Sequence, residues 1–455
     1  MKNFAPATTP ASQLRPKRTR QGTHPRPGAI ALWLLAMSFG LFSSACQETA
    51  PTGQNTPSPG GTPAGAGGLR IGSLLPATGD LAAVGQPMLN AVPLLVDEVN
   101  QCGGVNGAPM EFVGNVDDET KPEAGVQGMT KLAEVSRVAG VVGSFASSVS
   151  TAAVPIAVRN NVVLISPGST SPVFTEQAKK GEFNGYWART APPDTYQAPA
   201  LAKLAIDRGI KRAATIVINN DYGVGFEREF VKAFKALGGT VTNEAKPTRY
   251  DPKATTFDTE VQAAFSGKPE AVLAVLYAET GSLLLKTAYE QGVSQGVQIL
   301  LTDGVKSDKF PAQVGKTREG KFILEGAIGT VPGASGKALD AFTKRWQGKY
   351  GTTPAEYAPH AYDAAALLAL AAQAAGSNSG AAIKGKLREV ANAPGKEVAD
   401  VCEALDLLKK GEPINYQGAS GNVDIDENGD VVGSYDVWQV QADGSLKTID
   451  TVTPQ

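Results

Sequence analysis

Short runs rich in Val, Ile and Leu alternate with longer amphipathic segments from residue 69 onward, and this alternation limits the fold more than any other feature. Unbroken apolar runs are typical of strands buried on both faces of a parallel sheet, and the segments between them carry apolar residues at spacings of three and four. The pattern therefore predicts an α/β fold. The expected strands are 69–75, 110–116, 138–144, 161–166, 213–219, 240–246, 271–276, 297–302 and 322–329, and the expected helices include 85–100, 122–136, 225–239 and 280–292.

The C-terminal segment 422–449 has a different pattern. It contains Asn428-Gly429, a dipeptide that favours the two-residue turn of a β-hairpin, so we expect antiparallel strands on either side of it. The acidic spacing over residues 424–430 matches the first half of a calcium-binding loop, but the twelfth position is Tyr435 rather than a bidentate Glu. We therefore predict a polar turn there and no metal site.

Residues 1–45 have the composition of a secretion signal. Six Lys and Arg and no acidic residue precede the apolar run 29–42, which is shorter than the roughly 20 residues that a membrane-spanning helix needs. The run ends in Ser43-Ser44-Ala45-Cys46, which resembles the lipobox of bacterial lipoproteins, although that family usually has Leu, Val or Ile where this chain has Ser43. We expect lipidation of Cys46, and the alternative is a secreted protein that is cleaved nearby.

Residues 46–68 are expected to form a flexible tether because they are dominated by Gly, Pro, Ser and Thr and offer almost nothing to bury. The rest of the protein would then work outside the cytoplasm, close to a membrane. Without residues 1–45, 36 basic and 44 acidic residues remain, a net charge of −8. Such a balance argues against a nucleic-acid partner, which calls for a basic face.

Two cysteines, Cys102 and Cys402, remain after the expected cleavage. In an oxidising compartment they suggest one disulfide, but their distance in sequence makes the pairing depend on the fold, and two unpaired thiols are the alternative. The part of the chain after the tether has about 385 residues, more than one hydrophobic core usually supports, so we expect two lobes.

Polar and aromatic residues follow the predicted strands, where ligands bind in open α/β sheets. Segments 145–148 and 167–170 offer small hydroxyls and backbone N–H groups that suit an anion. Segments 220–223 and 277–279, together with Asp303, offer tyrosines and carboxylates. A zwitterionic small molecule held between two lobes would satisfy both kinds of loop.

Several segments together resemble the type I periplasmic binding proteins of ABC transporters, in particular the leucine/isoleucine/valine-binding family. They are 71–107, 141–155, 162–172, 186–194, 216–225 and 435–445. The resemblance runs from about residue 69 to the C-terminus and implies two Rossmann-like lobes with parallel sheets, joined by three crossing segments near 189–191, near 326–330 and before the final hairpin. Lobe 1 would comprise 69–190 plus about 330–420, and lobe 2 would comprise 191–329 plus about 421–455.

The resemblance also implies the residues that bind the ligand. The implied set is Ser147, Gly168, Ser169, Thr170, Tyr222, Tyr277 and Asp303. The hydroxyl of Ser147 and the loop 168–170 match positions that hold the carboxylate and ammonium of an amino acid, and the two tyrosines match aromatics of the second lobe. Asp303 stands where amino-acid binders usually present a glutamate to the ammonium, and this shorter side chain puts the ligand's identity in doubt.

The sequence thus predicts an extracytoplasmic lipoprotein that captures a small solute, most readily a branched-chain or other amino acid, and delivers it to an ABC permease without a cofactor or catalysis. The alternatives are a ligand-sensing receptor domain of the same fold, a binder of urea, short amides or aromatic acids, and a small-molecule enzyme. Two observations argue against an enzyme. His24 is lost with the signal, which leaves His360 as the one remaining histidine, and the sequence shows no nucleophile–base pair.

Overall fold

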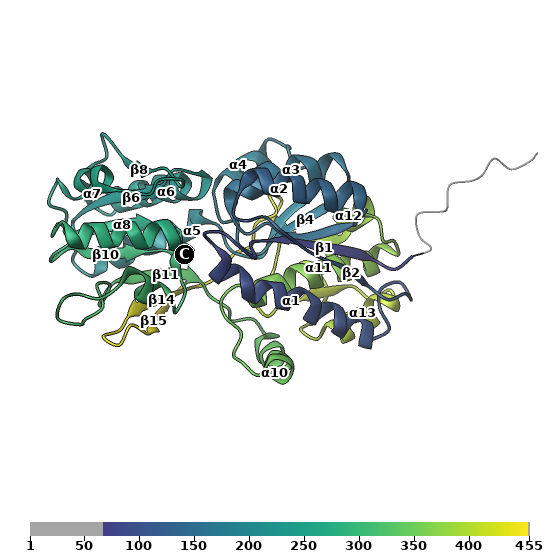
Figure 1. Ribbon diagram of the computed structural model, residues 1–455. Helices are drawn as coiled ribbons and strands as arrows, with labels where there is room; N and C mark the ends of the chain where they lie inside the picture. Colours follow the sequence, from purple (N-terminus) through teal and green to yellow (C-terminus); the bar gives the residue numbers. More distant parts are fainter. Residues whose placement is uncertain (1–66, 454–455) are drawn as a thin grey trace, which may run out of the picture. The chain divides into compact units, whose positions relative to one another are not determined.

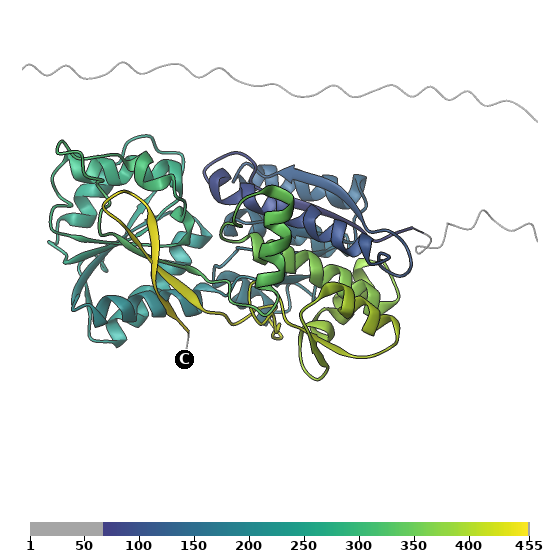
Figure 2. The same ribbon diagram turned by 90° about the horizontal axis from the view of Figure 1, so that it is seen from below.

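The computed structural model describes residues 67–453, in which two large sheets, each packed against helices, form two lobes (Figures 1 and 2). A small third sheet pairs β12 (Lys396–Val398) with β13 (Ile414–Tyr416). The predicted α/β class is therefore confirmed. Cys46, the expected signal 1–45 and nearly all of the expected tether 46–68 lie outside the described residues. Within 67–453, no helix combines the length and the apolarity that crossing a membrane requires.

Lobe 1 is built on a five-stranded, fully parallel sheet in the order β2-β1-β3-β4-β5. Its strands are β1 Arg70–Leu75, β2 Glu111–Asp117, β3 Gly140–Gly143, β4 Val163–Ser166 and β5 Trp187–Arg189, and its helices are α1 Ala82–Gln101, α2 Pro122–Thr130, α3 Ser147–Arg159, α4 Val173–Lys179, α11 Ala358–Ala375, α12 Gly380–Ala391 and α13 Val401–Lys409. Both faces of the sheet are covered: Ile71 and Leu75 pack with α1 and α11, whereas Leu74 packs with α2 and α3. This burial on two sides explains the unbroken apolar runs of the sequence.

Lobe 2 is built on a mixed sheet in the order β15-β14-β11-β10-β9-β6-β7, with β8 also paired to β6. Its strands are β6 Arg212–Ile218, β7 Thr240–Val241, β8 Thr248–Tyr250, β9 Ala271–Val275, β10 Gln298–Leu301, β11 Ile328–Pro332, β14 Tyr435–Val440 and β15 Leu446–Val452, and its helices are α5 Asp194–Asp207, α6 Asp221–Ala236, α7 Asp258–Phe265, α8 Ala278–Glu290 and α9 Phe310–Val314. Helix α10 (Leu339–Tyr350) packs on α1 of lobe 1, where the Tyr350 hydroxyl donates to the carbonyl of Asn90 over 2.9 Å.

The hairpin predicted around Asn428-Gly429 is wrong in position. The C-terminal hairpin is formed by β14 and β15, which turn at residues 441–445. At the predicted site the Asp426 carboxylate accepts the backbone N–H groups of Asn428 and Asp430, which closes a tight turn. The backbone N–H of Asp426 donates to the carbonyl of Asp430 across this turn, and Gly429 and Asp430 bond to Arg189 of β5 in lobe 1.

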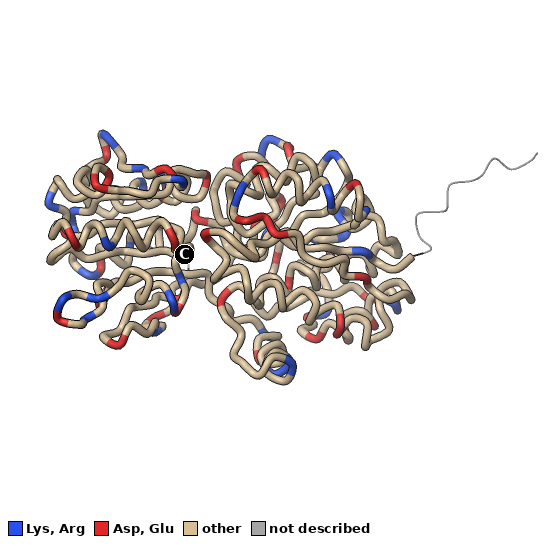
Figure 3. The backbone as a smooth tube through the Cα atoms, in the orientation of Figure 1, with Lys and Arg blue, Asp and Glu red and all other residues tan. Residues whose placement is uncertain are grey.

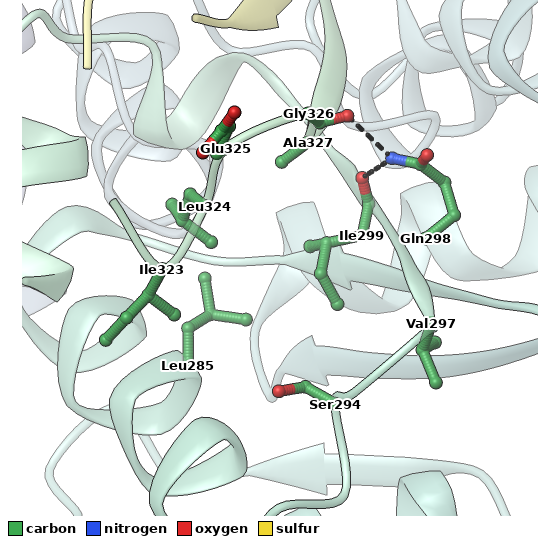
Figure 4. A pocket seen from close by; sticks show the side chains of 10 residues that line it. All are labelled: Leu285, Ser294, Val297, Gln298, Ile299, Ile323, Leu324, Glu325, Gly326 and Ala327. Carbon is green, nitrogen blue, oxygen red and sulfur yellow. Dashed lines mark hydrogen bonds between the residues drawn. The ribbon is translucent and has the colours of Figure 1, made fainter. Parts of the chain in front are cut away.

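The expected strand 322–329 is displaced to 328–332, because the chain makes a turn before it enters the sheet. Gly326 has φ +83°, and the amide of Gln298 donates to the carbonyls of Ile299 and Gly326 over 3.0 Å each (Figure 4). Figure 4 also shows the apolar side chains that face this turn, around a cavity of about 140 Å³. The Gln298 bridge satisfies two carbonyls that a longer β11 would have paired with strand neighbours.

Three segments of the chain pass between the lobes. The first follows β5, the second follows β11, and the third runs from about residue 418 to β14. The second passage begins after Pro332, slightly later than the resemblance implied, because β11 belongs to the sheet of lobe 2. Within lobe 1, Cys102 at the end of α1 is disulfide-bonded to Cys402 in α13, with Cα atoms 5.5 Å apart.

Candidate functional site

A cleft of about 750 Å³ lies between the lobes at the carboxyl ends of their strands. It is lined from lobe 1 by Gly79, Asp80, Glu119, Thr120, Lys121, Pro122, Glu123 and Ser148, and from lobe 2 by Asn219, Asn220, Asp221, Pro252, Lys253, Tyr277 and Glu279. The position agrees with the general location of ligand sites in α/β sheets, and the volume suits a small molecule. Of the seven ligand residues that the resemblance implies, Tyr277 lines this cleft.

Behind the cleft lies a buried polar group of six residues, the inner cluster, in which both lobes take part. Its members are Thr170, Asp194, Gln197, Tyr222, Asp303 and Tyr357. Thr170 and Tyr357 come from lobe 1, and the other four residues come from lobe 2. The structure thus brings three of the expected residues, Thr170, Tyr222 and Asp303, to one place.

Asp303 is held by three donors. Its Oδ1 atom lies 2.9 Å from the hydroxyl of Tyr222 and 2.9 Å from the amide nitrogen of Gln197, and its Oδ2 atom accepts the Tyr357 hydroxyl over 3.1 Å. Because Tyr357 belongs to lobe 1, this last bond joins the lobes. Burial raises the pKa of Asp303 despite these donors, since the site removes the carboxylate from water.

Asp194 has a different environment. It is the first residue of α5, and its two carboxylate oxygens are buried without a hydrogen-bond partner within residues 67–453. Burial and then the charge of Asp303 raise the pKa of Asp194 well above its ordinary value. The neighbouring Thr170 side chain and then Arg189 act in the opposite direction and lower this pKa, but the guanidinium of Arg189 is already bound by Asp430. Two buried carboxyl groups of this kind suit a cation that can donate hydrogen bonds to both.

Groups that suit an anion lie beside the inner cluster. Helix α3 begins at Ser147, and its N-terminal turn carries no side-chain cap, so backbone N–H groups remain for a ligand. The Thr170 hydroxyl is buried without a hydrogen-bond partner in the described part of the chain. Ser147 Oγ accepts the backbone N–H of Ser171 over 3.3 Å, which places the loop 168–171 beside the start of α3.

Ser169 and Gly168 shape this loop from within. The Ser169 hydroxyl lies 2.8 Å from Ser150 Oγ and within 3.1 Å of the carbonyls of Ser144 and Phe145, so it fastens the loop to the β3–α3 turn. A Cβ atom on Gly168 would come within 2.0 Å of the Phe145 ring, which explains the glycine. Ser169 and Gly168 therefore support the loop, and Thr170 is the member that belongs to the inner cluster beside Asp194.

Aromatic side chains form the walls of the site. The rings of Tyr222 and Tyr277 stack with centroids 5.8 Å apart and planes within 9°, and Tyr277 carries this wall into the cleft. On lobe 1, Phe145 meets Tyr357 edge to face, with ring centroids 4.7 Å apart. These rings offer an apolar surface between the inner cluster and the opening of the cleft.

Asp80 and Glu279, here called the mouth pair, face each other across the opening of the cleft. Asp80 lies in the β1–α1 loop of lobe 1, and Glu279 lies in the first turn of α8 in lobe 2. Burial, the charge of Glu279 and a hydrogen bond with it raise the pKa of Asp80 to about 6. The other titratable groups around this opening are Glu119, Lys121, Glu123, Asp221, Tyr250, Lys253 and Tyr277. Figure 3 shows acidic positions where the lobes face each other.

Three members of the inner cluster, Asp194, Gln197 and Tyr357, were missed by the sequence analysis. Asp194 and Gln197 follow β5, a strand of three residues that is too short to detect by apolar periodicity. Tyr357 follows no strand, and it reaches the site because its backbone adopts φ +65° before α11. For Asp194 a signal was present, since the resembling segment 186–194 ends on this residue.

Comparison with known proteins identifies the family of this chain. The receptor family ligand binding region matches residues 87–443. The chain belongs to this family. It is 28% identical to the chemotactic signal transduction system substrate-binding protein BasB of Halobacterium salinarum, over 84% of the chain and 88% of that protein. It is also 28% identical to a Leu/Ile/Val-binding protein homolog of Brucella abortus, over 83% of the chain and 92% of that protein.

Among solved structures, the leucine binding protein LivK of Thermotoga maritima matches with a TM-score of 0.70 and 26% identity, over 85% of this chain and 99% of that one. The expected type I periplasmic binding fold and the role of a solute-binding protein are therefore confirmed. The similar proteins are named as binding proteins, in agreement with a site that holds a molecule between two lobes.

Proposed function

We propose that this protein captures an amino acid with an apolar side chain between its lobes, outside the cytoplasm, and passes it unchanged to an ABC permease. The observation that carries the proposal is the inner cluster, in which Asp194 and Asp303 are buried together beside the N-terminus of α3. An ammonium would stabilise the two carboxylates, and a carboxylate would receive the helix N–H groups and the Thr170 hydroxyl. The names of the relatives support this ligand class.

Capture would follow from closure of the lobes. A ligand that touches Thr170 of lobe 1 and Asp303 of lobe 2 makes all of its contacts only when the lobes meet, so it shifts the hinge equilibrium toward the closed form. The closed form has its own contacts, including Ser171 Oγ to the carbonyl of Asp221 over 2.8 Å and the ion pair of Arg228 with Glu176 at 2.6 Å. Membrane attachment through Cys46 would keep this closed form near its permease.

The alternatives differ in what they ask of the site. An aromatic acid or a neutral amide would leave the two inner carboxyl groups without a cation. A sensory role, which the similarity to BasB favours, would use the same capture step with a signalling partner in place of a permease. Catalysis would fall to His360, but burial lowers the pKa of His360 to about 3, so this imidazole is a weak base, and we propose that the protein is not an enzyme.

The test is calorimetric titration of the protein carrying Cys46→Ser, refolded first to remove any bound molecule. L-Leucine is compared with 4-methylpentanoate, which lacks the amine, and with 3-methylbutylamine, which lacks the carboxylate. We expect L-leucine to bind with a stoichiometry of one and to be recovered unchanged, and each analogue to bind far more weakly. Tight binding of 4-methylpentanoate or benzoate without binding of L-leucine would contradict the proposal.

A further inference from the structure

Arg189 is a fully buried arginine at the end of β5, and its guanidinium reaches four different groups. Its Nη1 atom donates to the carbonyls of Ser169 and Ser171 over 2.9 and 3.0 Å, and its Nη2 atom donates to the hydroxyl of Thr175 over 2.9 Å. Its Nε and Nη2 atoms lie 2.8 and 2.7 Å from Oδ1 of Asp430. One side chain thus holds the ligand loop 168–171, helix α4 and the third crossing segment.

Further bonds fasten the third crossing at the same point. The backbone N–H of Arg189 donates to the carbonyl of Gly429 over 2.9 Å, and the Thr175 hydroxyl donates to Oδ2 of Asp430 over 2.6 Å. Gly429 has φ +85°, and a Cβ atom there would come within 2.6 Å of the Trp187 carbonyl, so the close approach to β5 requires glycine. The third crossing therefore leaves lobe 1 from a fixed position beside Arg189.

The first crossing starts from the same residue, since the chain leaves β5 directly after Arg189. We propose that Arg189 is a positioning residue that couples the ligand loop 168–171 to two of the three crossing segments on which the lobes hinge, the first and the third. Through it, the carbonyls of the loop and the exit points of both crossings share one rigid junction. The coupling to ligand capture rests on the function proposed above, whereas the control of lobe geometry does not.

Lysine is the informative replacement. It keeps the charge, but a single ammonium cannot reproduce the planar set of donors that reaches two loop carbonyls, Thr175 and Asp430 together. The matched control is Arg249, whose Nε and Nη2 atoms lie 3.0 and 2.9 Å from Oε2 of the buried Glu227, between β8 and α6 of lobe 2. Arg249→Lys removes an arginine–carboxylate pair within one lobe, at a side chain that is 39% exposed and not buried like Arg189.

The experiment measures the distance between the lobes and the affinity for L-leucine. Spin labels are placed at Lys131→Cys on lobe 1 and Lys232→Cys on lobe 2, both exposed, in the full chain carrying Cys46→Ser. For Arg189→Lys we expect a broader distribution of distances between the labels without ligand, and a Kd for L-leucine raised about thirtyfold or more. Arg249→Lys should change neither quantity, while both variants lower the melting temperature.

The proposal is overturned if Arg189→Lys matches Arg249→Lys in distance distribution and Kd and differs from the parent only in melting temperature, because Arg189 would then be a structural anchor. If the parent protein does not bind L-leucine, the proposed ligand class fails, and the distance distribution without ligand still decides the role of Arg189. If Arg189→Lys does not fold, Asp430→Asn, which keeps the shape of the side chain, provides the same comparison.

Discussion

The inner cluster and the mouth pair each bring two acidic side chains together, yet their surroundings give them opposite relations to a ligand. Asp194 and Asp303 are fully buried beside hydroxyl groups and a helix N-terminus, so a cation can stabilise both. Asp80 and Glu279 come from opposite lobes and meet at the opening of the cleft, where burial and the charge of Glu279 raise the pKa of Asp80. We propose that the inner cluster serves capture and the mouth pair serves closure.

The largest effect is expected at Asp194. Asp194→Asn removes one carboxyl group from the inner cluster. It should weaken L-leucine binding about hundredfold or more, because the buried ammonium of the ligand loses one of its two partners. Calorimetry measures the change, and Asp207→Asn, in the exposed pair with Lys203 at the other end of α5, is the control. If the affinity of Asp194→Asn equals that of Asp207→Asn, the inner cluster does not hold the ammonium.

A smaller loss is expected at Asp303, since this residue keeps three protein partners whether or not a ligand is present. Asp303→Asn should weaken L-leucine more than tenfold and leave the melting temperature within a few degrees of the parent. Titration together with a thermal scan separates the two readouts. Unchanged affinity would remove Asp303 from the site and leave Asp194 as the only candidate for the ammonium.

The mouth pair should respond to pH. The pKa of Asp80 is raised from its ordinary 3.8 to about 6 when the lobes are closed. The proton therefore stabilises the closed form in full below about pH 4, and this contribution is lost as pH rises through about 6. Between pH 5 and pH 7.5 the parent protein should lose about tenfold more affinity for L-leucine than Asp80→Asn, whose amide cannot ionise.

Glu123→Gln, which changes another acid of the same cleft, is the control for this pH series. The parent protein and Asp80→Asn both contain the inner cluster, so the ratio of their Kd values for L-leucine reports the contribution of the mouth pair alone. A ratio that stays constant across the series would show that Asp80 and Glu279 do not link closure to protonation.

The sequence predicted some residues of the site better than others. Tyr222, Tyr277 and Asp303 follow β6, β9 and β10, which lie in apolar runs, so their place at the edge of the lobe 2 sheet could be predicted from local pattern. Asp194 follows a strand of three residues, and Tyr357 depends on the packing of its ring against Phe145. The sequence analysis predicted a hairpin where the third crossing lies, because Asn428-Gly429 favours a turn in either structure. Only the contact of this turn with β5 distinguishes the crossing from a hairpin. Local pattern thus predicts strands and what directly follows them, whereas contacts between distant segments complete the site.

The most direct measurement of the central claim is the number of protons exchanged when L-leucine binds. Burial holds the pKa of Asp194 well above its ordinary value, so an arriving ammonium should lower this pKa and expel a proton. Titrations at pH 7 in phosphate and in Tris, which differ in ionisation enthalpy, give the number directly. We expect the parent protein to release protons when L-leucine binds and Asp194→Asn to release fewer. Binding of L-leucine with no proton release, or with proton uptake, in both proteins would contradict a buried carboxyl pair that receives the ammonium.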